Sequence, residues 1–180
     1  MKNNILCLLI IVSIFSCKEH KTDAIHGQPI SPSQKSFENN FLKFSYPEDW
    51  IITDDEEMDE GIHYISIEKK GYNSSGIITI TSYEGLISLD DLITINIEQL
   101  EQNLGFANFK QNAIVESKFN TNQSRSSNFE FVTLGLSFEG TVYAFQGINN
   151  SYVLLKEGAL EDVKKNSNGF KMIEESLEIK

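Results

Sequence analysis

The feature that most constrains the fold is a set of strand-like segments that are apolar on both faces. Successive side chains of a strand point to opposite faces of the sheet. In "NFEFVTLGLSF" (128–138), Phe129 and Phe131 fall on one face. The apolar residues on its other face are Val132, Leu134, Leu136 and Phe138. A sheet that is apolar on both faces must be covered on both. We therefore predict an α+β fold, a three-layer α/β/α sandwich with a mainly antiparallel central sheet and one helix on each face.

Two segments have the apolar spacing of amphipathic helices. In the first, 88–105, leucine and isoleucine recur at helical intervals. Ser88 suits the N-cap, Asp91 stands three residues later as in a capping box, and Gly105 suits the position after the last turn. The second helix is predicted within 160–178, where apolar residues again form one stripe.

Glycine and asparagine mark the expected turns, because both residues tolerate positive φ. Glu139-Gly140 and Asn149-Asn150 each separate two strand-like segments. The later strands are therefore predicted to run as an antiparallel meander. Similar residues between positions 166 and 169 are expected to break the first turn of the second helix.

Cys17 follows a short apolar run that begins after Lys2. The run, 5–15, is too short to span a bilayer as a helix, which needs ~20 apolar residues. A positive start, an apolar middle and a small residue, Ser16, are typical of a secretory signal. With Ile14 three places before the cysteine, the segment resembles the lipobox of bacterial lipoproteins. The resemblance implies a diacylglyceryl group on the Cys17 thiol, cleavage just before it, and a lipid-anchored location in the cell envelope, on either the inner or the outer membrane.

Other roles for Cys17 find less support in the sequence. Cys7 would leave with the signal, so the mature chain would have no second cysteine for a disulfide. A nucleophile needs a base held beside it, and the spacing of His20 and His26 matches no established metal motif. An ordinary secretory signal followed by an idle cysteine is the remaining alternative.

The chain is predicted to have three parts. They are a lipoprotein signal peptide (1–16), a polar, flexible tether (17–36) and a single domain (37–180). Loss of Lys2 with the signal changes the net charge from −11 to −12. This charge disfavours nucleic acid as a partner. It also gives no attraction to anionic lipids, so the lipid itself would be the membrane anchor.

The domain resembles the PsbP-like family at both of its ends. The opening "FLKFSYPEDWIIT" is similar to a family pattern in which a strand meets Tyr-Pro-x-x-Trp. The matching residues are Tyr46, Pro47 and Trp50 at the opening, and Phe170, Ser176, Leu177 and Ile179 at the end. The resemblance implies a non-catalytic domain that binds other proteins, as most family members do, with some binding cations and with no family-wide catalytic residues. It also places Trp50 against the sheet beneath a helix.

The acidic segment "DDEEMDE" (54–60) lies between two strand-like segments. Converging carboxylates would suit a hard cation such as calcium. The EF-hand spacing fails, however, because counting from Asp55 puts Glu60 rather than glycine at position six and Ser66 rather than glutamate at position twelve. We predict a solvated acidic turn. His63 is expected at a strand edge or rim, since no partner nucleophile is signalled.

Three functional hypotheses follow from these patterns. The first is a lipid-anchored cell-envelope protein whose domain is a non-catalytic protein-binding or assembly module with an envelope protein as its partner. The second is a divalent-cation-binding or sensing lipoprotein that uses the segment 54–60, and the third is an enzyme of unknown type. No catalytic, cofactor-binding or metal-binding residue is assigned, and Cys17 is the single site residue, as the lipid acceptor.

Overall fold

The computed structural model describes residues 33–71, 74–105 and 108–180. The predicted signal peptide, Cys17 and most of the predicted tether lie outside these residues. The first strand, β1, begins at Gln34, so residues 34–36 belong to the folded domain rather than to the tether.

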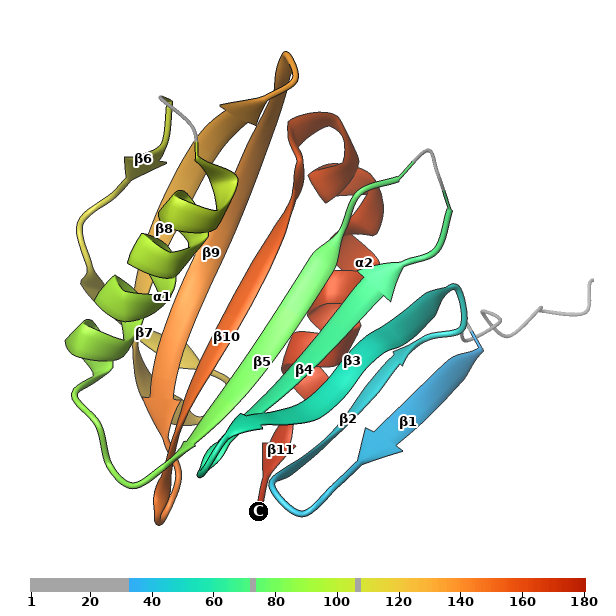
Figure 1. Ribbon diagram of the computed structural model, residues 1–180. Coiled ribbons are helices and arrows are strands. Elements are labelled where there is room, and N and C mark those ends of the chain that lie inside the picture. Colours follow the sequence, from blue (N-terminus) through green and yellow to red (C-terminus); the bar gives the residue numbers. More distant parts are fainter. Residues whose placement is uncertain (1–32, 72–73, 106–107) are drawn as a thin grey trace, which may run out of the picture. The chain divides into compact units, whose positions relative to one another are not determined.

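The domain is built around an eight-stranded antiparallel sheet (Figure 1). In spatial order its strands are β3 (Trp50–Asp59), β4 (Ile62–Lys69), β5 (Ile77–Glu84), β10 (Asn150–Ala159), β9 (Leu136–Gln146), β8 (Asn122–Thr133) and β6 (Lys110–Gln111), while β7 (Val115–Phe119) also pairs with β8. Every neighbouring pair in this sheet is antiparallel. The predicted meander is therefore present from β8 to β10.

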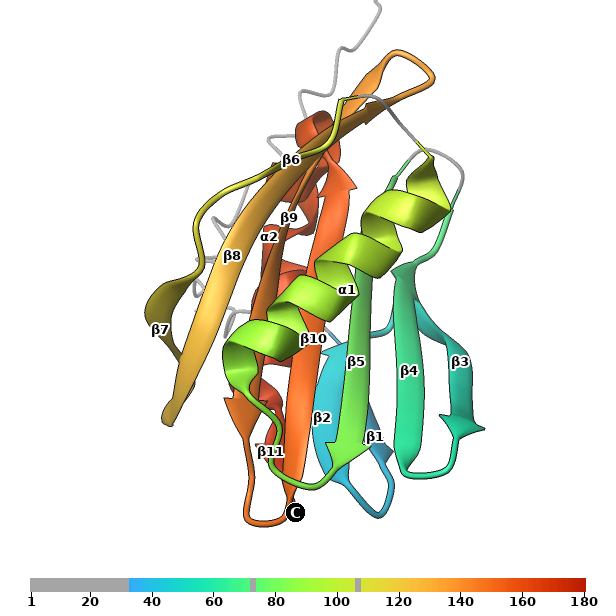
Figure 2. The same cartoon turned by 60° about the vertical axis from the view of Figure 1, so that its left-hand side comes forward.

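One helix lies on each face of this sheet, which confirms the predicted sandwich (Figure 2). Helix α1 (Leu89–Leu104) packs on β8, β9 and β10. Helix α2 (Leu160–Ser176) lies on the opposite face. It shares that face with a second, three-stranded sheet, which the sequence analysis does not separate from the first. The strands of this small sheet are β1 (Gln34–Glu38), β2 (Leu42–Pro47) and β11 (Glu178–Ile179).

Strand β10 shows why both faces must be covered. Its residues Tyr152 and Leu154 are fully buried in the core on the α2 side. Val153 and Leu155 alternate with them and are buried in the core on the α1 side. The period of two along this strand thus supplies apolar side chains to two separate cores.

The signals for the first helix are confirmed at both of its ends. The Ser88 side chain accepts a hydrogen bond from the Asp91 backbone N–H. Gly105 has the left-handed conformation, with φ of 60°, and its N–H donates to the Glu101 carbonyl. Together these contacts satisfy backbone groups that a helix end otherwise leaves unpaired.

The second helix is present, but the predicted break in its first turn is wrong, since α2 is continuous. Asn166 is buried, and its Nδ2 donates to the Ser75 carbonyl in the segment before β5. Gly169 lies against the indole of Trp50, where a side chain has no room. Both residues are therefore explained by close packing rather than by a turn. Trp50 itself is 2% exposed and meets Phe170 of α2 edge-on at 5.3 Å between ring centroids, which confirms its predicted burial.

The segment 128–138 is a hairpin rather than one strand. Leu134 and Gly135 form its turn, with φ values of 51° and 80°. The predicted turn at Glu139-Gly140 is wrong, because both residues lie within β9. Gly140 is needed there for close approach, since a Cβ would lie 2.2 Å from Cζ of Phe129. The predicted hairpin near Asn149-Asn150 is confirmed between β9 and β10, where the Gly147 N–H donates to the Asn150 carbonyl.

Candidate functional site

The acidic residues singled out in the sequence lie along β3, so the predicted turn is wrong, whereas their predicted exposure to solvent is confirmed. Residues 54–59 belong to this strand, and only Glu60 and Gly61 connect it to β4. The register with β4 divides their carboxylates between the two faces of the sheet, so they do not all point to one place. Among the described residues, no group of three or more His, Cys, Asp or Glu is arranged to hold a metal ion.

The position of β3 gives the acidic residues a structural role. Within the described part of the chain, β3 is an edge strand of the large sheet. An exposed strand edge can pair with another chain, and charged side chains are a common means of preventing this. His63 lies on the neighbouring strand β4, and its Nε2 is 2.7 Å from Oδ1 of Asp55. Asn39 Nδ2 is 3.3 Å from the same ring nitrogen. The His63 side chain is 18% exposed and lies near the start of an inner strand rather than on the edge strand.

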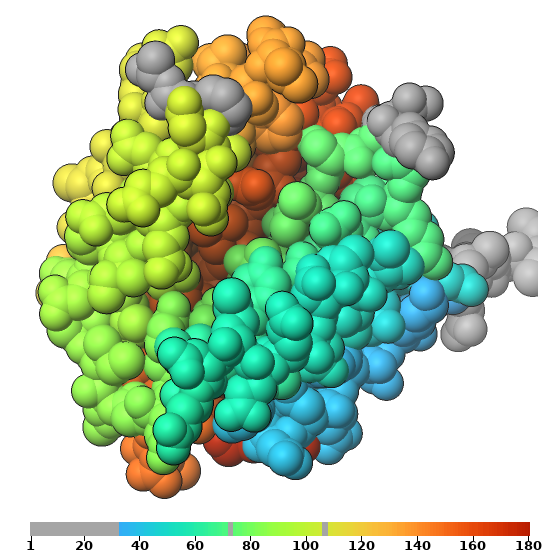
Figure 3. All heavy atoms as spheres, in the orientation of Figure 1, coloured from blue at the N-terminus to red at the C-terminus, as the bar shows by residue number. Residues whose placement is uncertain are grey.

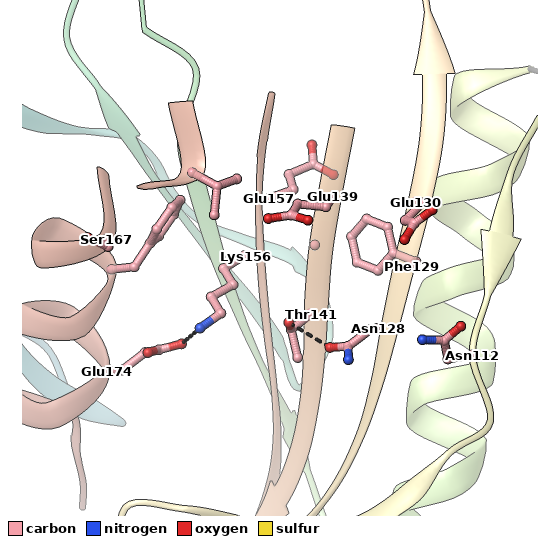
Figure 4. Close-up of a pocket in the computed structure, with 13 residues that line it drawn as sticks. Asn112, Asn128, Phe129, Glu130, Glu139, Thr141, Lys156, Glu157, Ser167 and Glu174 are labelled. Carbon is pink, nitrogen blue, oxygen red and sulfur yellow. Dashed lines mark hydrogen bonds and ion pairs between the residues drawn. The ribbon is translucent and has the colours of Figure 1, made fainter. Parts of the chain in front are cut away.

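A cleft of about 410 Å³ opens between helix α2 and the strands β8, β9 and β10 (Figure 4). Its polar lining residues are Asn112, Asn128, Glu130, Glu139, Thr141, Lys156, Glu157, Ser167 and Glu174, and its other lining residues are Phe129, Gly140, Val163 and Phe170. We take this concave, polar surface as the candidate site.

The pairing of β8, β9 and β10 determines which polar side chains line the floor of this cleft. Asn128, Thr141 and Lys156 are direct neighbours on three adjacent strands, so their side chains form one row across the sheet. Glu130 and Glu139 form a second polar rung on the same face. Helix α2 supplies the wall, because its residues 167, 170 and 174 recur at helical spacing and face the same side.

Two polar contacts organise the floor. Lys156 Nζ lies 2.5 Å from Oε1 of Glu174, joining β10 to α2 across the cleft. The same ammonium group lies 5.7 Å from the ring centroid of Tyr143. Thr141 Oγ1 donates to Oδ1 of Asn128 at 2.9 Å, which fixes the orientation of the amide. Of the charged groups in the cleft, one is basic and the others are carboxylates.

Glu157, next to Lys156, is in a different environment. Burial raises the pKa of its carboxyl to about 7. Its Oε2 has no hydrogen-bond partner among the described residues. A buried carboxylate without a partner is costly to ionise, so Glu157 favours the protonated form at mildly acidic pH.

None of these residues is assigned to a site from the sequence, although Phe129, Gly140 and Phe170 are named there in structural roles. The residues come from positions 112 to 174, and no short motif links them. One signal was available: Lys156 and Glu157 are charged residues at the end of the otherwise apolar strand "SYVLL". Charged residues in a buried strand are rare unless they are paired.

The described ranges contain no helix that is both long and apolar enough to cross a membrane. The Cys17 prediction remains untested, since that residue lies outside the described part of the chain.

No protein-family profile and no curated protein sequence matches the chain. Solved structures do match it. The cyanobacterial PsbP of Synechocystis has a TM-score of 0.57 at 8% identity, covering 83% of this chain and 94% of its own. LpqN of Mycobacterium tuberculosis, described as involved in cell envelope biogenesis, has a TM-score of 0.52 at 12% identity, covering 86% and 87%.

Two further structures share the architecture. The Ran-binding protein Mog1p of Saccharomyces cerevisiae has a TM-score of 0.50 at 12% identity, covering 83% of this chain and 96% of its own. A Bacteroides thetaiotaomicron protein has a TM-score of 0.54 at 15% identity over 81% of this chain. The chain spans about half of that protein, 48% of its length. At these identities the likeness concerns the fold, and the domain has the PsbP-like fold that its sequence predicts.

Proposed function

We propose that the protein is a lipid-anchored, non-catalytic binding module of the cell envelope, attached through Cys17 and engaging a protein partner in the cleft between α2 and β8–β10. The observation that carries this proposal is the open polar cleft itself. Its floor combines an oriented amide, an ion pair and further carboxylates within one concave surface.

The charges of the cleft indicate the chemistry of the partner. Glu139 and Glu130 could attract a basic side chain of a partner, although Lys110 of β6 is the register neighbour of Glu130. Lys156 is already paired with Glu174. A partner segment that presents Lys or Arg beside hydrogen-bonding groups would complement this surface. The overall charge of −12 after signal removal would guide such a partner to the domain.

The hydroxyl groups of the cleft support a non-catalytic role. A hydroxyl nucleophile needs a base that accepts its proton. Thr141 instead donates to the amide of Asn128, and the Ser167 hydroxyl donates to the Lys164 carbonyl at 2.8 Å. Neither acceptor is a base.

Proteins of the same fold give further support. LpqN is described as involved in cell envelope biogenesis, and Mog1p as a Ran-binding protein. A protein-binding role and an envelope location are therefore both compatible with this architecture. A shared fold supports a function only by analogy, whereas Cys17 and the cleft are features of this chain itself.

Site-specific photocrosslinking in the producing cell tests the proposal. A photoreactive residue replacing the exposed Asn128 in the cleft is expected to give one discrete protein adduct. The matched control replaces Glu98, an exposed residue of α1 on the opposite face, and is expected to give none. The absence of an adduct at position 128, or the same adduct at both positions, would refute the cleft as the binding site.

A further inference from the structure

The hairpin between β8 and β9, together with the first residue of α2, carries a group of exposed apolar side chains at the end of the sheet. We call Val132, Leu134, Leu136 and Leu160 the apolar tip; their exposed fractions are 39%, 98%, 52% and 57%. Val132 and Leu160 also line a shallow hollow of about 300 Å³ together with Phe138. The hairpin projects beyond the neighbouring strands in both ribbon views, and its surface is visible at the upper margin of Figure 3.

Neither packing nor turn geometry accounts for a leucine at position 134. The residue is almost fully exposed, so it contributes nothing to the core. Its φ of 51° lies in the left-handed region, where this kind of two-residue turn favours Asn, Asp or Gly. The next residue, Gly135, satisfies that preference with φ of 80°. Leucine at position 134 is therefore unfavourable both for the backbone conformation and for exposure to water. Such a conflict is typical of residues that contact another molecule.

We propose that the apolar tip inserts into the interface of a lipid bilayer, as a second contact between the domain and the membrane. The proposal rests on the lipid anchoring proposed for Cys17. Sixteen residues separate Cys17 from Ser33, the first described residue. Fully extended, they reach about 55 Å. An anchored domain would thus stay within reach of the bilayer, where even a weak apolar contact is sustained by a high effective concentration.

The size of the apolar tip favours lipid over a protein surface as its occupant. A stable protein–protein interface buries roughly 800 Å² on each partner. A few side chains at one end of a hairpin can bury much less area than this. A fluid lipid phase, unlike a protein surface, needs no complementary shape to accommodate them. Interfacial segments typically bury their apolar groups by about 5–10 Å. Glu130 and Glu139 lie three rungs behind Leu136, or about 10 Å at the rise of a strand, so the carboxylates would remain at the headgroups.

A tryptophan reporter tests the proposal directly. The probe is the chain from residue 17 with its single thiol, Cys17, coupled to a maleimide lipid in the vesicles, which keeps the domain tethered and contains every described element. In this background, Leu136→Trp is expected to give blue-shifted emission with phosphatidylcholine vesicles and to be quenched by brominated lipid. The native Trp50 is a constant background because it is buried. The matched control is Ile148→Trp, an 83% exposed position in the β9–β10 connection, which is expected to show no change. Equal shifts in both reporters, or none in Leu136→Trp, would overturn the proposal.

Leu134→Asn separates membrane contact from folding. Asparagine suits the positive φ at this position, so the melting temperature is expected to stay the same or rise. The equilibrium between inserted and free Leu136→Trp reporter in the tethered protein, measured by quenching with brominated lipid, is expected to weaken about tenfold, since a leucine side chain contributes at least that much on burial. Unchanged partitioning would overturn the proposal. Lipid labelling of Cys17 is measured separately, so a failure of the proposed anchoring is distinguishable from a failure of the tip.

Discussion

Gly169 of α2 faces the indole of Trp50 so closely that a Cβ at this position would lie 2.6 Å from Cζ2 and 2.7 Å from Nε1. Glycine inside a helix is about 1 kcal/mol less favourable than alanine. The helix contains this unfavourable residue at the point where it crosses the buried tryptophan. The glycine in α2 thus leaves the space that the tryptophan of the Tyr-Pro-x-x-Trp motif occupies.

Gly169→Ala is expected to destabilise the domain. The added methyl group would displace the indole, and overpacking of this kind costs about 1–3 kcal/mol, enough to exceed the gain in helix propensity. Denaturant unfolding measures the change. Asn168→Ala, at the exposed neighbouring position, is the control and should be neutral or slightly stabilising. A Gly169→Ala domain of full stability would contradict the packing described for Trp50.

Trp50→Ala is expected to unfold the domain or to leave it barely stable. Truncation of a buried tryptophan costs about 3–5 kcal/mol, out of a total stability of about 5–15 kcal/mol for a typical domain. Since Trp50 is the single tryptophan, the intact protein should show blue-shifted emission that iodide does not quench. Red-shifted, freely quenched emission from a folded protein would place Trp50 on the surface.

Glu157→Gln is expected to stabilise the domain above neutral pH. Burial raises the folded pKa of Glu157 from 4.5 to about 7. The folded state therefore holds its proton more tightly, so this contribution is fully present below pH 4.5 and is lost as pH rises through 7. The shift corresponds to about 3 kcal/mol at alkaline pH. Melting temperatures between pH 5 and pH 8 should fall in the native protein and fall less in Glu157→Gln. Glu161→Gln, at an exposed site, should retain the native slope.

Cys17→Ser is expected to abolish membrane anchoring. Stable attachment needs two or more acyl chains at ~0.8 kcal/mol per buried CH₂, and the serine hydroxyl is not a substitute for the acylated thiol. Cell fractionation should find an uncleaved precursor or a soluble form. If the variant were cleaved and still fractionated with membranes through the same N-terminus, lipidation of Cys17 would be wrong.

Calcium at millimolar concentration is expected to leave the melting temperature nearly unchanged. A ligand stabilises a protein only in proportion to how far its concentration exceeds the dissociation constant, and the carboxylates of β3 alternate between the two faces of the strand. Asp55→Asn with Asp59→Asn is the matched variant. A calcium-dependent rise that this variant lacks would establish a cation site on β3.

Local chemistry accounts for what the sequence predicted. The Ser88 and Gly105 caps and the period-two pattern of "YVLL" are properties of neighbouring residues, so the helices and the two-sided sheet follow from them. The hairpin at Leu134-Gly135 was missed because leucine is unfavourable at positive φ. The cleft was missed because Lys156 and Glu174 meet through the packing of a helix on a sheet, which no local pattern encodes.

The acidic edge strand β3 would affect how closely copies of the protein approach one another on a membrane. A lipid anchor of the kind proposed would confine many copies to two dimensions, with their sheets free to approach edge to edge. Each copy would present the same row of carboxylates along residues 54–59, so the approaching edges would repel one another. The carboxylates of β3 would thus keep neighbouring copies separate on the membrane. If they were neutralised, the exposed edge strands would be expected to pair from one copy to the next.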